Sequence, residues 1–468
     1  MSDRSISYPG GGKAPPEVSA APGNSAPTRP WPSSRSAWYV AILLMLANTL
    51  AFVDRQALAL LVEPIKQDLK ISDTAISLLY GLSFTLFYVA VGLPVARIAD
   101  RSSRRNIIAG SIFVWSICTS LCGVARSFGG LFLARVGVGA GEGGLTPAAY
   151  SLLADYFPKK KLAAAMGVYQ MGLYIGGASA LVIGGLISSI IPPSSIVTVL
   201  VLGSLKGWEV VFLLLGLPGI ILSLLCFTIR EPARQGAGAA QASVSLGEFF
   251  GHVGTRWRSY VGIALGFALM ILCGNGTTVW IPAFFARAFG WSTAEVGQYY
   301  GPVVFVCGTS GALAGGFFAS WLRRRGYADA NLRAALIGFS ILVPLSVGFP
   351  LMPTAGLALT MIALMNFFAG FNFGGGLAAL QELTPNRMRA LVSAMYMLTI
   401  NLIGAALGPM AIALCTDYVF ADPQRLPQAI SLVCAIASPL SVLVLWTGLR
   451  DYRQRMTEIG GGGVETAL

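Results

Sequence analysis

The stretch Ala96-Arg97-Ile98-Ala99-Asp100-Arg101-Ser102-Ser103-Arg104-Arg105 occurs twice in recognisable form. Its second copy, 220 positions later, reads Gly316-Phe317-Phe318-Ala319-Ser320-Trp321-Leu322-Arg323-Arg324-Arg325. Each copy closes an apolar run with arginines, and the final basic pair is kept. The acid of the first copy, Asp100, is replaced by Ser320 in the second. A helix end that recurs in this way suggests an internal repeat.

A second repeated pair supports the first. Asp155-Tyr156-Phe157-Pro158 returns as Glu382-Leu383-Thr384-Pro385, at an offset of 227 residues. Arginine, glycine and proline are common at helix ends, so either match alone is weak. Two matches at nearly equal offsets indicate a duplicated architecture of two halves.

The composition places both halves in a membrane. Hydrophobic residues make up 55% of the 468, charged residues only 11%, and the mean hydropathy is +0.70. Apolar runs of about 20 residues predict membrane-spanning helices, and the runs lack the period-2 alternation of a barrel. The twelve predicted spans are 37–62, 75–97, 105–124, 128–154, 160–190, 207–229, 259–286, 296–321, 333–351, 355–383, 389–417 and 428–449.

A polar stretch between the sixth and seventh spans divides the chain. We expect an all-α membrane protein with twelve transmembrane helices in two pseudo-symmetric six-helix bundles. The expected parts are a disordered cytoplasmic tail over 1–36, bundles over 37–229 and 259–450, a cytoplasmic linker over 230–258, and a second tail over 451–468. The proline- and glycine-rich start lacks a cleavage-type site, so it is interpreted as a tail and not a signal peptide.

The net charge of +12 does not indicate a nucleic-acid partner, because most of the 32 lysines and arginines fall in the loops on one side of the membrane. The positive-inside rule then puts both termini in the cytoplasm. We expect the protein to lie in the inner membrane of the cell. All seven cysteines lie in predicted spans, which argues against disulfides and metal sites. We expect no cofactor. The single histidine, His252, lies in the linker, so any proton coupling must use carboxylates.

Two spans carry charge at membrane depth. Asn48-Thr49-Leu50-Ala51-Phe52-Val53-Asp54-Arg55-Gln56 holds an acid and a base side by side, and Arg135-Val136-Gly137-Val138-Gly139-Ala140-Gly141-Glu142 holds a second pair. Such groups are costly in a membrane and usually face a cavity. We expect an exchangeable network in which Asp54 and Glu142 carry protons and Arg55 and Arg135 bind an anionic headgroup. The alternative is two structural ion pairs that lock helices.

The second half has almost no intramembrane charge. We expect its mildly polar and aromatic residues to line the cavity opposite the charges, although such a stripe is more often packing: Asn275, Thr278, Asn366, Phe367, Phe371 and Asn372. Glycine clusters beside them, Gly374-Gly375-Gly376 among them, mark expected bends. Glu63, Arg287 and Asp417 stand at predicted helix ends, where we expect them to face solvent or the membrane interface.

The loop after the second span is expected to work as a cytoplasmic gate. Asp100, Arg104 and Arg105 would hold it against the other half when the inner side is closed. A solvated basic loop is the alternative.

With these features the chain resembles the major facilitator superfamily over all twelve helices. Asp100-Arg101 followed by Arg104-Arg105 resembles its signature between helices 2 and 3, with Ala96 and Ser103 where glycine is usual, and Arg135 matches a second signature. Gly167, Gly176, Gly184 and Gly185 have the spacing of the antiporter motif, but Ala180-Leu181 replaces its Gly-Pro. Close helix packing is the other interpretation of these glycines.

The amino-terminal half also resembles the spinster family of lipid transporters. The residues that carry this resemblance are Phe52-Val53-Asp54-Arg55, Pro94, Trp115-Ser116, Arg135, Gly139-Ala140-Gly141-Glu142, Pro147 and Asp155-Tyr156-Phe157-Pro158. The resemblance implies an alternating-access carrier for sphingolipids or lysophospholipids, with Asp54 and Glu142 as protonation sites.

We therefore expect a proton-coupled secondary transporter of an amphipathic anionic lipid, not an enzyme, that works as a monomer among membrane lipids. The alternatives are a multidrug or organic-anion exporter of the same fold, a non-transporting receptor, and a membrane-embedded lipid enzyme.

Overall fold

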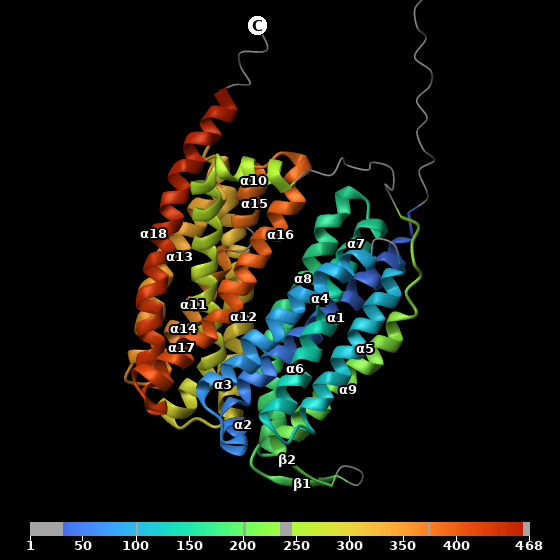
Figure 1. Ribbon diagram of the computed structural model, residues 1–468, viewed down its shortest axis with the longest axis vertical. Helices are drawn as coiled ribbons and strands as arrows, with labels where there is room; N and C mark the ends of the chain where they lie inside the picture. The colour runs from blue at the N-terminus through green and yellow to red at the C-terminus, as the bar shows by residue number, and fades with distance from the viewer. Residues whose placement is uncertain (1–30, 100–101, 200–202, 235–245, 373–374, 462–468) are drawn as a thin grey trace, which may run out of the picture.

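The computed structural model describes residues 31–99, 102–199, 203–234, 246–372 and 375–461. The chain forms two helical bundles that stand side by side, one from each half of the sequence (Figure 1). The bundles converge where the small β-sheet lies, which we call the hairpin end, and diverge toward the end where the described chain begins and finishes, which we call the termini end (Figure 1).

The first bundle is built from residues 34–226. Its elements are α1 (Ser34–Leu60), α2 (Val62–Leu69), α3 (Asp73–Ser77), η1 (Leu78–Leu82), α4 (Ser83–Ala99), α5 (Arg104–Cys122), α6 (Phe128–Glu142), α7 (Leu145–Tyr156), α8 (Lys159–Ile190), β1 (Ile196–Val199), β2 (Gly203–Lys206) and α9 (Gly207–Cys226). The two strands form an antiparallel hairpin, with Ile196 opposite Lys206. This hairpin is an addition to the expected all-α fold.

The second bundle follows a short helix, α10 (Leu246–Gly254). Its elements are α11 (Trp257–Phe289), α12 (Thr293–Arg324), α13 (Ala330–Gly348), η2 (Phe349–Leu351), α14 (Ala355–Ala369), η3 (Gly370–Asn372), α15 (Gly375–Glu382), η4 (Asn386–Met388), α16 (Arg389–Thr399), η5 (Ile400–Ala406), α17 (Leu407–Leu414), η6 (Cys415–Val419), η7 (Pro423–Arg425) and α18 (Leu426–Gly461). The last helix therefore continues well past the expected end of its span at residue 449.

Within the described residues, ten helices are long and apolar enough to cross a membrane. The other two predicted spans, 128–154 and 355–383, are interrupted. Two glycines, Gly143 and Gly144, separate α6 from α7, and a 3-10 turn that begins at Gly370 follows α14. Gly143 and Gly370 are 227 positions apart, which is the offset of the second repeated pair. The interruptions are therefore pseudo-symmetric, and glycine explains both because it weakens a helix interior.

The halves are held together along α8 and α12. Gly185 of α8 faces Gly297 of α12 so closely that a Cβ built on Gly297 would lie 2.8 Å from the Cα of Gly185. Gly176, on the same helix, packs equally closely on Thr49 of α1. At these positions the motif glycines of α8 serve close helix packing.

Ion pairs join the halves at the hairpin end. Arg287 of α11 binds both carboxylate oxygens of Asp73 at 2.7 Å and also binds Glu63 at 2.6 Å. Lys66 adds a third contact to Asp73, at 2.7 Å. Asp417 accepts hydrogen bonds of 2.7 Å from the backbone and side chain of Thr74. The expectation that Glu63, Arg287 and Asp417 face solvent or the membrane interface was wrong, because each has a partner in the opposite half.

At the termini end the expected gate loop is tied into its own bundle. Arg104 is 1% exposed and binds Asp155 of α7 and, at 2.8 Å, Glu231. The backbone of Arg105 donates to Glu231 at 3.0 Å. Although partial burial opposes ionisation, hydrogen bonds from Arg105 and Arg104 hold the pKa of Glu231 below its usual value. Asp100 lies outside the described residues.

Candidate functional site

The two adjacent charged residues of α1, Asp54 and Arg55, lie in different surroundings. Adjacent residues on a helix point about 100° apart, so Asp54 and Arg55 cannot share one partner. Asp54 is 2% exposed and accepts a hydrogen bond of 3.0 Å from Thr119 of α5. Arg55 points from α1 toward α6. Within the described chain, no arginine lies within ion-pair distance of Asp54.

Arg55 forms the central ion pair of the site with Glu142. Its Nε and Nη2 donate to the same carboxylate oxygen of Glu142 at 2.9 and 2.6 Å. The guanidinium also lies over the rings of Phe84 and Tyr88, with centroid distances of 4.4 and 5.2 Å. Glu142 is 1% exposed whereas Arg55 keeps 26% of its side chain accessible. The arginine is thus the member of the pair that a ligand can reach.

Arg135 lies in the same place, but among the described residues no acid is within ion-pair distance of it. It is 1% exposed, and its Nε and Nη1 have no hydrogen-bond partner. The other carboxylate oxygen of Glu142, Oε1, is also unpartnered. Buried polar groups are rarely left unpaired, so this half-satisfied network marks a place where a ligand, water or proton would be stabilised.

Small residues on α6 allow these groups to meet. A Cβ on Gly139 would lie 2.4 Å from the backbone oxygen of Phe84, and a Cβ on Gly141 would lie 2.7 Å from the nitrogen of Trp115. Only glycine permits α6 to approach α4 and α5 so closely. The alternation of glycine between Arg135 and Glu142 therefore sets the depth at which both charges sit beside α1.

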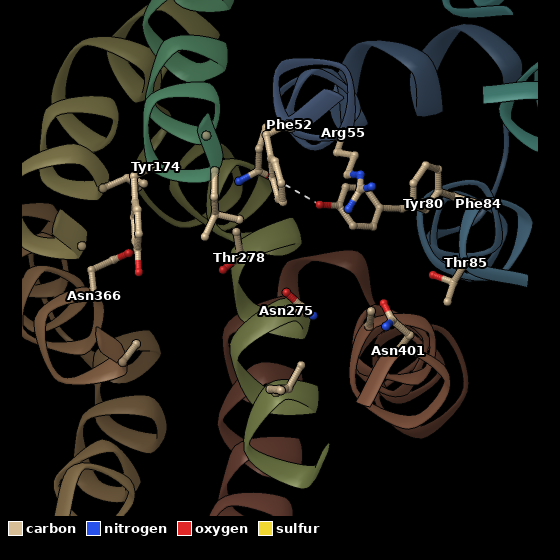
Figure 2. Close-up of a pocket in the computed structure, with 18 of the residues that line it drawn as sticks. Phe52, Arg55, Tyr80, Phe84, Thr85, Tyr174, Asn275, Thr278, Asn366 and Asn401 are labelled. Atoms are coloured by element: carbon tan, nitrogen blue, oxygen red, sulfur yellow. Dashed lines mark hydrogen bonds between the residues drawn. The ribbon is translucent and has the colours of Figure 1, made fainter. Parts of the chain in front are cut away.

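A cavity of about 460 Å³ lies between the halves at this level. Arg55, Arg135 and Tyr80 line it from the first half, and Asn275, Thr278 and Asn366 from the second. Figure 2 shows Arg55 and Tyr80 on one side with Asn275 and Thr278 opposite. The wall from the first half is charged and aromatic, and the wall from the second half carries no charge and mixes polar with apolar side chains.

A second cavity of about 530 Å³ continues into the second bundle. It shares Asn275, Thr278 and Asn366 with the first cavity, so the two are adjacent. Most of the side chains that it adds are apolar: Phe267, Met270, Ile281, Phe339, Leu342, Met365, Leu377, Tyr396 and Met397. The site thus joins a charged chamber to an apolar one.

Two of the expected cavity residues lie elsewhere. Phe367 and Phe371 do not line either chamber; their rings pack on each other at 5.8 Å, and Phe371 packs on Phe318 of α12 at 5.6 Å. α12 approaches the interrupted helix closely, with Gly311 against the backbone of Phe367. Phe371 lines a separate cavity beside the end of α12. Asn372 belongs to η3, and its side chain lies outside what the structure describes.

Several lining residues were missed by the sequence analysis. Tyr80 lies in the π-helical turn η1 and Asn401 in the π-helical turn η5, and both face the cavity. Tyr80 donates to Gln56 at 3.0 Å. A π-turn shifts the side chains that follow it and often occurs at functional sites. The sequence feature that could have indicated these π-helical turns is a glycine within each apolar span, Gly81 in η1 and Gly404 in η5.

No cluster of three or more histidine, cysteine or acidic side chains that could hold a metal ion occurs among the described residues.

Comparison with known proteins agrees with this architecture. Residues 44–409 match the family model described as Major Facilitator Superfamily. An MFS-type efflux pump of Mycolicibacterium smegmatis is 30% identical over 91% of this chain and 95% of its own. A probable L-galactonate transporter of Escherichia coli is 25% identical over 65% of this chain and 68% of its own.

A solved structure of a bacterial homologue of the human lysosomal transporter spinster, inward-facing and unoccupied, is also similar. It has a TM-score of 0.72 and 28% identity, covering 90% of this chain and 97% of that one. The relatives are transporters and not enzymes. From the fold, the paired charges and these similarities together, the chain belongs to the major facilitator superfamily, as a spinster-like, multi-pass membrane transporter.

Proposed function

We propose that this transporter moves an amphipathic anionic lipid, such as a lysophospholipid or sphingolipid-like molecule, by proton-coupled alternating access. The single observation that carries the proposal is that the side chain of Arg135 is buried without a hydrogen-bond partner for two of its nitrogens. Its guanidinium is buried at the wall of the charged chamber with two nitrogens unpartnered. A buried cation with no acid at ion-pair distance among the described residues favours a bound anion, and guanidinium binds phosphate and carboxylate in a bidentate way.

The two chambers support a substrate with two ends. The charged chamber offers Arg55 and Arg135 to a headgroup, and the apolar chamber beside it offers Phe339, Leu342 and Met365 to a hydrocarbon tail. Burying a tail there is favourable by about 0.8 kcal/mol for each methylene. An anion without a tail would use only the first chamber.

Coupling to protons follows from the ion pair between Arg55 and Glu142. Protonation of Glu142 would cancel its charge and release Arg55 to the headgroup, whereas ionised Glu142 holds Arg55 at 2.6 Å. Asp54 has only Thr119 as a described hydrogen-bond partner and stands one residue from Arg55, so it can take the proton in a second state of the network. Ionised Glu142 and the substrate headgroup thereby compete for one arginine, so that protonation of Glu142 favours binding of the substrate.

The orientation rests on the positive-inside rule, because the termini end collects most arginines and lysines. We assign this end to the cytoplasm and the hairpin end to the outside of the inner membrane. The parts of the chain are then an amino-terminal tail, two bundles, a cytoplasmic linker that contains α10, and a carboxyl-terminal tail.

Uptake into proteoliposomes tests the proposal. Labelled lysolipid flux should rise when a pH gradient is imposed, and Glu142→Gln should remove that rise. Glu295→Gln is the matched control, because Glu295 is an exposed acid that caps α12 through Ser292 and lines neither chamber, so the variant should behave as the parent does. Flux that ignores the gradient in the parent, or that survives unchanged in Glu142→Gln and Asp54→Asn, contradicts the coupling. Absence of lipid flux from folded protein contradicts the substrate class.

A second candidate is export of apolar organic anions or drugs. It is favoured by the apolar chamber and by the 30% identity to the mycobacterial efflux pump. Expression in a drug-sensitive host separates the candidates. Resistance to cytotoxic compounds without lysolipid transport would favour export of drugs.

A further inference from the structure

The two repeated stretches, 96–105 and 316–325, differ in how many acidic side chains surround their arginines. In the first half, Arg104 is surrounded by two carboxylates, Asp155 and Glu231. Its hydrogen bonds to Ser151 and Pro232 complete the shell. The arginine is 1% exposed and needs no further anion.

Arg324, which stands 220 positions after Arg104, is an exposed residue at the end of α12, whereas Arg104 is the buried first residue of α5. At the offset of 220, Arg104 corresponds to Arg324 and Glu231 to Asp451; at the offset of 227, Asp155 corresponds to Glu382. Asp451 instead accepts from Ser259 at 2.5 Å and pairs with Arg455 at 3.0 Å. Within the described chain, no hydrogen bond or ion pair is formed by Arg324.

The second acid of this half is also engaged elsewhere. Glu382 accepts from Tyr452 at 2.5 Å and forms a long contact of 3.4 Å with Arg323. Ser320 stands where the first copy has Asp100, and its hydroxyl donates to its own helix at Gly316. Of the three consecutive arginines, Arg323 therefore has one long contact with a carboxylate, Arg325 stacks on Trp321, and Arg324 has no acidic partner among the described residues.

A cavity of about 550 Å³ lies beside Arg323 and Arg324. Arg323, Arg324 and Ser320 line it from α12, and Asn331 lines it from α13. The backbone of the interrupted helix, at Gly370 and Gly375, forms its far wall. The pocket combines two guanidinium groups and an amide with residues of the interrupted helix.

We propose that this pocket binds a phosphate-bearing anion, the headgroup of an acidic phospholipid in the leaflet at the termini end. Basic pockets between helices at this depth suit such headgroups, and paired arginines suit phosphate. Leu313 and Phe317 of α12 are 61% and 72% exposed, one turn from Gly316 and Ser320 of the pocket. This apolar surface favours a lipid, whose tails would cover it, over free phosphate. The bound headgroup ties α12 to the interrupted helix.

Binding can be measured directly by native mass spectrometry. The full chain in detergent is titrated with phosphatidylglycerol and, separately, with phosphatidylcholine. We expect tighter binding of phosphatidylglycerol, weakened about fivefold by Arg324→Gln, since one arginine near an anionic surface contributes about 1 kcal/mol. Arg324→Lys should keep most of the preference. Arg325→Gln is the matched control, because Arg325 stacks on Trp321 at 4.1 Å and does not line the pocket.

The outcomes separate the sources of the anion. Loss of phosphatidylglycerol binding on addition of millimolar inorganic phosphate would keep the anion site but assign it to free phosphate, and persistence of binding would assign it to the lipid. Equal binding of both phospholipids, or equal losses in Arg324→Gln and Arg325→Gln, would overturn the proposal. Melting temperatures without lipid check that each variant is folded. The readout is independent of the transported substrate.

Discussion

At the residue scale, Arg135 is the group with the least structural reason to be charged. Burying an ion without a partner costs several kcal/mol, and apolar packing beside Phe84 would be more stable. A residue that weakens the fold in this way is explained by what it binds. Arg55, in contrast, has both a structural partner and access to the cavity.

Replacement of Arg135 by glutamine should therefore weaken substrate binding while leaving the fold intact. Hydrogen bonds to charged groups contribute about 1.5 to 3 kcal/mol, so we expect KM for an anionic substrate to rise about tenfold to a hundredfold. Arg135→Lys should recover part of the affinity, because charge remains but the planar fork is lost. Concentration-dependent flux in proteoliposomes measures both. An unchanged KM in Arg135→Gln would remove Arg135 from the binding site.

At the element scale, the interrupted helices position the site. Gly143, at the break between α6 and α7, packs against α4: a Cβ there would lie 2.6 Å from the backbone oxygen of Tyr88 and 3.1 Å from the nitrogen of Gly92. Contacts of this length require the helices to move apart. The break and the close packing are thus two results of the same glycine.

Gly143→Ala should destabilise the first bundle by about 1 to 3 kcal/mol, which is typical of overpacking. Gly167→Ala is the control, because nothing lies within 4 Å of a Cβ at that helical position and alanine there is neutral or stabilising. Thermal unfolding of both variants in one detergent gives the comparison. Equal melting temperatures would show that α6 has room to relax.

The linker helix α10 is a second element with a defined attachment. Phe249 is 4% exposed within the second bundle, and Glu248 pairs with Arg387 at 2.5 Å. His252 accepts from Arg256 at Nδ1, at 3.1 Å, because a guanidinium only donates. Its Nε2 lies 3.2 Å from the hydroxyl of Tyr260. The imidazole is therefore neutral in this arrangement.

Acidification should loosen α10. Burial and the adjacent Arg256, with a further contribution from Arg387, hold the pKa of His252 below its usual value of 6.5. A lowered histidine pKa means that the docked state is favoured above 6.5 and is lost as pH falls through the lowered value. Hydrogen exchange of α10 at about pH 7.5 and about pH 5.5, compared with His252→Gln at each pH, measures this. The same pH response in both proteins would show that protonation of His252 does not cause the loosening of α10.

At the scale of the whole molecule, the ion pairs at the hairpin end hold the observed state. Of the ion pairs among the described residues, those that cross between halves are the two made by Arg287, to Glu63 and Asp73. Asp73 is fully buried, and the side chain of Arg287 is 5% exposed. Opening this end for alternating access must break these pairs, so their strength sets the balance between the two states.

Arg287→Gln should shift the molecule toward opening at the hairpin end. Removing one partner of a buried pair costs about 3 kcal/mol or more, and the double variant Arg287→Gln with Asp73→Asn should recover part of that cost. Spin labels at Gln67 and Gln424, in a cysteine-free background, report the separation across this end. A distance distribution identical to that of the unsubstituted background would show that the pairs do not control the state.

The sequence by itself determined the fold class, the duplicated halves and the superfamily, because hydrophobic length and repeated helix ends depend only on residue order. It also singled out Asp54, Arg55, Arg135 and Glu142, since charge is rare in apolar spans. The sequence did not show which side chains these charged groups contact. That Arg55 binds Glu142 while Arg135 stays unpaired depends on side chains from α1, α4 and α6 meeting in space.

Only the tertiary structure shows which ion pairs close the hairpin end and which side chains line the cavities. Glu63, Asp73 and Arg287 are far apart in sequence and looked like surface charges at helix ends; only convergence of the two halves buries them together. Phe367 and Phe371 looked like cavity residues, but the direction of a side chain in an interrupted helix depends on where the helix is interrupted. Local sequence fixes which segments are helices. The rotation of each helix, and therefore what its side chains touch, depends on contacts between segments hundreds of residues apart.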